Sequence, residues 1–211
     1  MSGHCHDCHL GAAEARDPRW RRILWIALVV NAAMFFIEVA AGLSAESASL
    51  LADAVDFAGD ALNYAASLLV LGMAAVWSTR LAALKGAVML GYGLVVLARA
   101  AWLAWAGSSP EAFTMGGIGL LAFAANLAVA LLLYRYRGGS ANAQSVWLCS
   151  RNDALGNLAI VLAALGVFGT GTAWPDLIVA AFMAVLGISG GWQVLRRVRE
   201  ERAAAAAHAH G

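Results

Sequence analysis

The chain has 211 residues, of which 62% are hydrophobic and only 13% charged, and its mean hydropathy is +0.72. Soluble domains carry about 25% charged residues, so the composition excludes an ordinary soluble domain and indicates a membrane protein with several spans. The net charge is +1, from 14 basic and 13 acidic residues, and gives no sign of a nucleic-acid partner. Three cysteines, two of them in the first eight residues, are too few for a disulfide framework.

Apolar runs of membrane length predict six helices. At about 20 residues per crossing, they lie near residues 22–42, 47–76, 82–106, 113–134, 145–168 and 175–195. The connections are then Gly42–Glu46, Trp77–Arg80, Gly107–Ala112, Arg135–Asn142 and Gly169–Trp174. We therefore expect an all-α, six-transmembrane-helix bundle. Residues 1–19 are expected to form a flexible His/Cys-rich tail, residues 20–200 the membrane domain, and residues 201–211 a disordered Ala/His tail that contains His208 and His210.

The basic residues predict the orientation of these helices. All of them except Arg99 and Arg151 lie before the first helix, after the sixth, or beside the second and fourth connections. The first, third and fifth connections contain no basic residue. Because basic residues are retained on the cytoplasmic side, both termini are expected in the cytoplasm. Polar residues fill the N-terminus as far as Arg22, so no cleavable signal sequence is expected.

The second predicted helix carries three aspartates in the middle of an apolar segment. Each charge at a bilayer centre costs about 2.5–3.5 kcal/mol, so three would cost roughly 8–10. The nine Leu, Val and Phe residues between Leu50 and Leu71 return only about 3–5 kcal/mol. The carboxylates must therefore face other helices, water, protons or a cation.

Polar residues of two helices can meet near the middle of the membrane. One face of the second helix carries, at i, i+3, i+7 and i+10, Asp53, Asp56, Asp60 and Asn63. One face of the fifth carries, at i, i+4 and i+8, Cys149, Asp153 and Asn157. Asp56 lies about 15 Å from the outer end of its helix at 1.5 Å per residue, and Asp153 lies at a similar depth. Four of these residues could ligate a tetrahedral ion: Asp56, Asp60, Cys149 and Asp153.

Other roles are open for these residues. An intramembrane aspartate can cap a broken helix or pair with an arginine, and Arg99 and Arg151 are available. Cys149 can be a small buried hydrophobic residue. Five further residues are candidates for the surroundings of the site or its access path, although some of them can equally serve helix packing: Asp53, Asn63, Asn157, Asn31 and Glu38.

The N-terminal tail has six potential metal ligands in succession: His4, Cys5, His6, Asp7, Cys8 and His9. Thiolate and imidazole suit a borderline-soft ion. The segment is too short and polar to fold alone, so we interpret it as a cytoplasmic arm that captures metal. The alternative is a tail that binds metal without functional consequence.

The run from Gly42 through the LLADA block to Asp60 resembles the second-helix signature of the cation diffusion facilitator family. That signature has the approximate form S-x-S/A-L-L-A-D-A-x-[HD]-x-x-x-D, and the serines and both acids coincide. The segment Cys149-Ser-Arg-Asn-Asp153 resembles the fifth-helix H-x-x-x-D of the same family. The resemblance covers essentially residues 20–200.

The resemblance implies that Asp56, Asp60 and Asp153 are transport-site ligands, and that Cys149 occupies a position usually held by histidine. Family members typically exchange cytoplasmic Zn²⁺ or related ions for protons, as homodimers that alternate between inward-facing and outward-facing states. Two departures are expected. Too few residues follow Arg202 for the family's C-terminal cytoplasmic domain, and the short segment Arg135–Asn142 stands where some members have a His-rich loop.

We therefore expect an efflux transporter for Zn²⁺, Cd²⁺ or Co²⁺ with protons as counter-ions, no prosthetic group and no enzymatic activity. Its expected partners are the lipid bilayer, a second copy of the chain and divalent metal ions, with no nucleic acid, and its expected location is a bacterial inner membrane. Two other functions fit part of the sequence. A membrane-anchored metal sensor or metal-delivery protein would depend on the tail, and a proton-coupled carrier of organic cations would need an aromatic-lined cavity around one acid.

Overall fold

The computed structural model describes residues 17–70, 75–136 and 141–209. Within these ranges it describes the side chains of all residues except 70, 75–82, 85, 141–146, 148, 149, 197 and 201–209. The described residues form six helices and no strand: α2 (Pro18–Ser44), α3 (Ala48–Val70), α4 (Ala75–Ala106), α5 (Ala112–Tyr134), α6 (Ala141–Thr170) and α7 (Trp174–Ala209). The predicted all-α bundle of six helices is confirmed.

Five segments of these helices are long and apolar enough to cross a membrane: Pro18–Ser44, Gly86–Ala106, Ala112–Tyr134, Ser150–Thr170 and Trp174–Glu200. The helix missing from this set is α3, which carries the three aspartates. Helix α3 also contacts every other helix in the described bundle. The helix least suited to lipid is therefore the one that the other helices surround.

Polar caps fix where two of the helices begin. Asp17 precedes Pro18 and accepts hydrogen bonds from the backbone N–H of Arg19 at 2.8 Å and from the Tyr136 hydroxyl at 2.9 Å. These bonds hold the pKa of the Asp17 carboxyl below its ordinary value. Glu111 caps α5 in the same way, through the backbone N–H groups of Phe113 and Thr114. Proline at the first helical position and an acid before it are typical helix starts.

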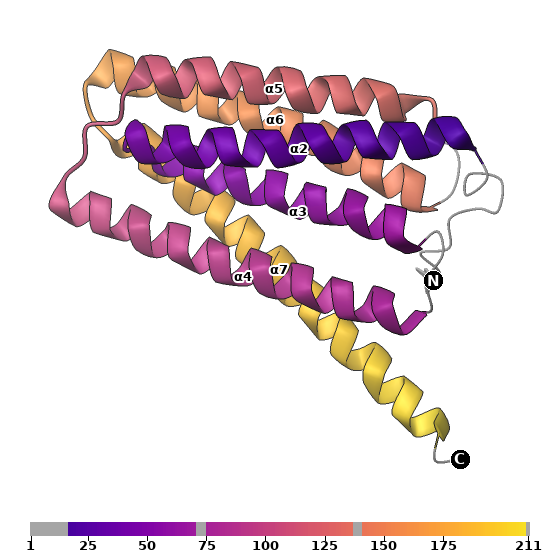
Figure 1. The fold of residues 1–211 in the computed structure, drawn as a ribbon. Coiled ribbons are helices and arrows are strands. Elements are labelled where there is room, and N and C mark those ends of the chain that lie inside the picture. The colour runs from indigo at the N-terminus through magenta and orange to yellow at the C-terminus, as the bar shows by residue number, and fades with distance from the viewer. Residues whose placement is uncertain (1–16, 71–74, 137–140, 210–211) are drawn as a thin grey trace, which may run out of the picture.

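The three described connections lie together at one end of the bundle (Figure 1). We call this the connection end, made of residues 45–47, 107–111 and 171–173. A backbone hydrogen bond of 3.0 Å from Glu111 N–H to the Ala45 carbonyl joins two of these connections. The opposite end, where α2 begins and α7 finishes, is called the termini end.

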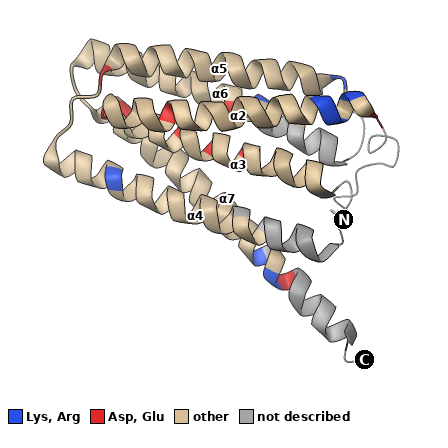
Figure 2. Cartoon of the chain, in the orientation of Figure 1, with Lys and Arg blue, Asp and Glu red and all other residues tan. Residues whose placement is uncertain are grey.

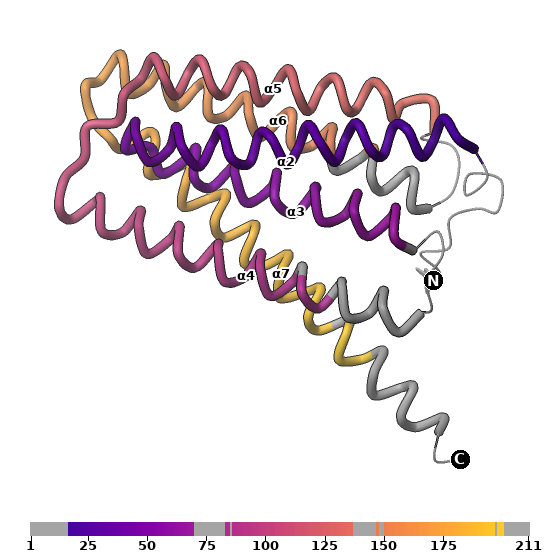
Figure 3. The backbone as a smooth tube through the Cα atoms, viewed as in Figure 1, coloured from indigo at the N-terminus to yellow at the C-terminus, as the bar shows by residue number. Residues whose placement is uncertain are grey.

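The helices form two groups. Helices α2, α3, α5 and α6 run side by side as a four-helix group, while α4 and α7 pack on each other (Figures 1 and 3). This α4–α7 pair contacts the four-helix group near the connection end and diverges from it toward the termini end (Figure 1). The six-helix bundle is therefore wedge-shaped, and its narrow edge is the connection end.

Glycines allow α4 and α7 to approach closely. A Cβ atom on Gly191 would lie 2.8 Å from the carbonyl oxygen of Gly86 and 2.8 Å from the backbone nitrogen of Leu90. A Cβ atom on Gly93 would lie 2.9 Å from the Ile188 side chain. Small residues at a crossing bring helix backbones into direct van der Waals contact, which is how helices associate in membranes.

Two expectations from the sequence are wrong. The predicted connection Trp77–Arg80 lies inside α4, because polar residues can extend a helix beyond its apolar stretch without ending it. The predicted disordered tail at 201–211 is helical as far as Ala209, because its alanine run has the highest intrinsic helix propensity. An Arg196–Glu200 ion pair of 2.9 Å at i, i+4 spacing supports α7 just before this tail.

Candidate metal centre

A layer of buried polar side chains crosses the four-helix group at mid-depth. It has one member from each helix: Asn31 on α2, Asp60 on α3, Asn126 on α5 and Asn157 on α6, all at most 7% exposed. Counted from the helix terminus at the connection end, these residues lie 13, 12, 14 and 13 positions away. At about 1.5 Å per residue this is roughly 18–21 Å, the middle of a membrane-spanning helix.

Hydrogen bonding leaves much of this layer unsatisfied. Asn31 donates to the Ala27 carbonyl at 2.8 Å, but its side-chain oxygen has no hydrogen-bond partner among the described residues. The same holds for the side-chain oxygen of Asn126 and for both amide atoms of Asn157. An unsatisfied buried polar group costs about 1–3 kcal/mol, so such a group calls for an explanation such as water, an ion or a functional role.

Three acids lie between this layer and the connection end. Asp53 and Asp56 are five and eight residues from the start of α3, and Glu38 is six residues from the end of α2. Glu38 and Asp53 are 0% exposed, and their carboxyl groups lie close enough to interact. Neither makes a hydrogen bond of normal geometry with the described part of the chain. Glu38 also interacts electrostatically with Asp56, so α2 contributes an acid to the group centred on α3.

Asp153 brings α6 into contact with the same group. Its carboxyl lies close enough to interact with the Asp60 carboxyl, and it interacts electrostatically with Asp56 and Asp53. The structure therefore brings the predicted acids of α3 and α6 close enough to interact.

Tyr64 links the same two helices and was not singled out from the sequence. Its hydroxyl lies 3.5 Å from the Asp60 carboxylate and 2.8 Å from the Ser150 hydroxyl, and both Tyr64 and Ser150 are buried. The signal was present, because Tyr64 follows Asp60 by four residues and Ser150 precedes Asp153 by three, which puts each on the face of its acid. These two residues connect α3 to α6 beside the acids.

Other predicted site residues are less closely involved or fall outside the description. Asn63 is half-buried, and Arg151 donates to Asn152 at 3.1 Å and lies 5.3 Å from the centre of the Trp147 ring. The side chain of Cys149 and the whole tail with its six potential ligands, His4, Cys5, His6, Asp7, Cys8 and His9, lie outside the described residues. Among the described residues, no three His, Cys, Asp or Glu side chains are already arranged as metal ligands.

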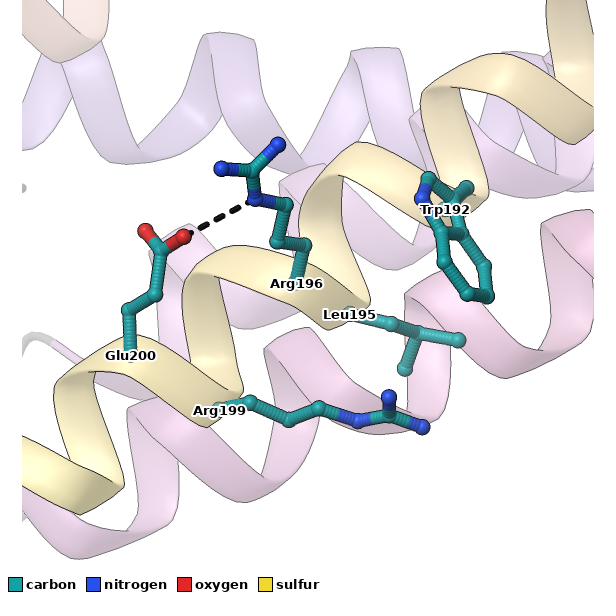
Figure 4. Close-up of a pocket in the computed structure, with 5 residues that line it drawn as sticks. All are labelled: Trp192, Leu195, Arg196, Arg199 and Glu200. Atoms are coloured by element: carbon teal, nitrogen blue, oxygen red, sulfur yellow. Dashed lines mark hydrogen bonds and ion pairs between the residues drawn. The ribbon is translucent and has the colours of Figure 1, made fainter.

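Acidic and basic residues occupy different parts of the bundle. The three aspartates of α3 and the single acid of α2, Glu38, lie along these helices, whereas the basic residues of α2 lie at its start (Figure 2). A pocket near the end of α7 is of a different kind (Figure 4), and its lining is Trp192, Leu195, Arg196, Arg199 and Glu200. With two arginines and one acid that is already ion-paired, this pocket is unsuited to a dication.

The family model for the cation efflux transmembrane domain matches residues 24–201 of the chain. This match spans all six described helices, including the acids of α2, α3 and α6. No curated protein matches the chain significantly. Since the matched segment is far more than half of the 211 residues, the multi-pass membrane protein described here belongs to the cation efflux family, a family of transporters.

Proposed function

We propose that this protein exports a divalent heavy-metal ion, Zn²⁺, Cd²⁺ or Co²⁺, in exchange for protons. The observation that carries the proposal is the contact between the Asp153 carboxyl on α6 and the acids of α3 inside a cation efflux domain. These carboxylates come from two separate helices and lie close together near mid-depth. A cation that crosses the bundle would find ligands there.

The ligands in this proposal are Asp56, Asp60, Asp153 and Cys149. Cys149 precedes Asp153 by four residues on α6, so it lies on the same side of the helix one turn away. A thiolate favours Zn²⁺, Cd²⁺ or Co²⁺ over Mg²⁺, which prefers oxygen ligands and retains its water. Binding would draw the carboxylates of α3 and α6 from their present mutual contact onto the ion.

Competition between metal and protons supplies the coupling. Three ionised carboxylates and a thiolate carry a formal charge of about −4, which a dication reduces to about −2. Without metal, repulsion between like charges favours the uptake of protons in place of the ion. Metal and protons then bind the same lone pairs in turn, so the site carries one species outward and the other inward.

The wedge shape suggests how the α4–α7 pair could move relative to the four-helix group. The α4–α7 pair diverges from the four-helix group toward the termini end (Figure 1). Basic residues of α2 lie at that end (Figure 2), so the positive-inside rule favours the cytoplasm as its location. We propose a bacterial inner membrane as the location and a homodimer as the assembly.

Proteoliposomes loaded with a metal-sensitive dye test this proposal under an imposed pH gradient. The Asp56→Asn, Asp60→Asn and Asp153→Asn variants should each lose at least tenfold in the rate of Zn²⁺ exchange, because each removes one charged ligand. Glu200→Gln is the matched control, since it neutralises an exposed acid on α7 and should retain the parent rate. Full metal-for-proton exchange in Asp60→Asn would refute the mechanism.

A further inference from the structure

A buried carboxylate at the connection end clamps two helices together. Asp176, the third residue of α7, is 0% exposed and accepts hydrogen bonds from the first turn of α3. The donors to its two oxygens are the Ser47 hydroxyl at 2.8 Å, the Ala48 N–H at 2.8 Å, the Ser49 N–H at 3.0 Å and the Ser49 hydroxyl at 2.5 Å. All four bonds join residues more than 120 positions apart in the chain.

This arrangement differs from an ordinary helix cap. An acid in the first turn of a helix usually stabilises that helix, but Asp176 instead uses both oxygens on a different one. Ser47 already caps α3, because its hydroxyl accepts the Leu50 N–H at 3.2 Å. The carboxylate therefore adds a connection between α3 and α7 to a helix start that is already capped. Next to it in the chain, Leu177 belongs to one buried apolar cluster with Ala48 and Ala180.

The clamp lies where the two groups of helices meet. Helix α7 is fixed to α4 by the contact of Gly86 and Gly191, and α3 belongs to the four-helix group. Toward the termini end the α4–α7 pair separates from that group, whereas at the connection end Asp176 holds the two together (Figure 1). A bond at the narrow edge of a wedge is where a rotation of its two parts has its axis.

We infer that Asp176 is a positioning residue for transport, the pivot that keeps the α4–α7 pair attached to α3 while the termini end opens and closes. The inference rests on the proposed function for its link to transport. Asp56 and Asp60 lie eight and twelve residues along α3 from Ala48, about 12 and 18 Å at 1.5 Å per residue. A fixed start of α3 therefore also keeps these acids at one depth while α7 swings.

The experiment measures Zn²⁺ transport kinetics in proteoliposomes for the parent, Asp176→Asn, Asp176→Ala and Ser49→Ala. The maximal rate should fall in this order: parent, Ser49→Ala, Asp176→Asn, Asp176→Ala, with at least a tenfold loss in the last. The KM should change less than threefold, because a pivot affects interconversion of states more than the ligands of the ion. Glu111→Ala is the matched control, since Glu111 caps only its own helix at the same end, and it should remain within twofold of the parent.

Several results would overturn the inference. One is a maximal rate in Asp176→Ala that equals that of the parent. Another is a loss of maximal rate in Glu111→Ala as large as that in Asp176→Ala, which would indicate general destabilisation. If Asp176→Ala does not fold, a parental rate in Ser49→Ala overturns it instead.

Hydrogen exchange separates this inference from the proposed function, because it needs no transport. The amides of Ala48 and Ser49 should exchange at least tenfold faster in Asp176→Asn than in the parent, while the amides after Glu111 should be unchanged. Unchanged exchange would refute the clamp even in a protein that transports metal. If the parent protein transports no metal but the Ala48 and Ser49 amides still exchange faster in Asp176→Asn, the proposed function is refuted and the clamp remains.

Discussion

The contact between α4 and α7 predicts a large difference in thermal stability between two neighbouring substitutions, Gly190→Ala and Gly191→Ala. A Cβ atom on Gly191 would lie 2.8 Å from two backbone atoms of α4, and backbone cannot turn away as a side chain can. On Gly190 the nearest neighbour would be the flexible end of Met89 at 3.6 Å, an ordinary contact. Gly191→Ala must therefore push the helices apart, whereas Gly190→Ala is accommodated.

The size of the difference follows from these contacts. Replacing glycine by alanine inside a helix gains about 0.5–1 kcal/mol, and this gain is common to both variants. Overpacking costs typically 1–3 kcal/mol and applies only to Gly191→Ala. The two variants should thus differ by about 1–3 kcal/mol, which corresponds to roughly 2–12 °C in Tm for a chain of this size.

The assay is thermal unfolding of purified protein in detergent, followed by the fluorescence of its eight tryptophans. Gly190→Ala should match or exceed the parent Tm, and Gly191→Ala should fall below it. Equal Tm values for the two variants would refute the close crossing of α4 and α7, and with it the reasoning that these helices move as a pair.

Three further predictions concern the site and the tail. Cys149→His should retain Zn²⁺ transport but lower the preference for Cd²⁺, because imidazole is less soft than thiolate, and an unchanged Cd/Zn transport ratio would show that the thiolate is not a ligand. Deleting residues 1–10 should leave transport intact with a weaker apparent affinity, whereas complete loss of transport would instead favour the tail as the functional site. Tyr64→Phe should lower the Tm by about 2–4 °C, since it removes a buried hydrogen bond to Ser150 of about 1 kcal/mol, and an unchanged Tm would contradict that bond.

Hydropathy and residue spacing were sufficient to predict the order of the helices and the acids of α3 and α6 that lie close together. The carboxylates of α3 could be placed on one face because a helix repeats every 3.6 residues, and the contact of Asp153 with Asp60 follows from similar depths on two helices. The expectation for Cys149 as a ligand stays a prediction. The ends of helices were harder to place, as the helical tail after Glu200 shows, because alanine supports a helix without any apolar periodicity.

The role of Asp176 could not be predicted from the sequence. An aspartate after a proline at a helix start looks like a cap for its own helix. Its partners, Ser47 and Ser49, belong to a helix start more than 120 residues earlier, and only the packing of α7 against α3 brings them together. Ser47 and Ser49 carried part of the family resemblance, yet the pattern gave no reason for hydroxyl groups at those positions.

The central claim is that acids of α3 and α6 hold one exchangeable dication. Calorimetric titration of Zn²⁺ into protein lacking residues 1–10, and into its Asp60→Asn, Asp153→Asn and doubly substituted forms, tests it most directly. A shared site predicts one bound ion per chain, a large loss of affinity in either single variant, and little further loss in the double variant. Two independent sites, each abolished by only one of the substitutions, would contradict it.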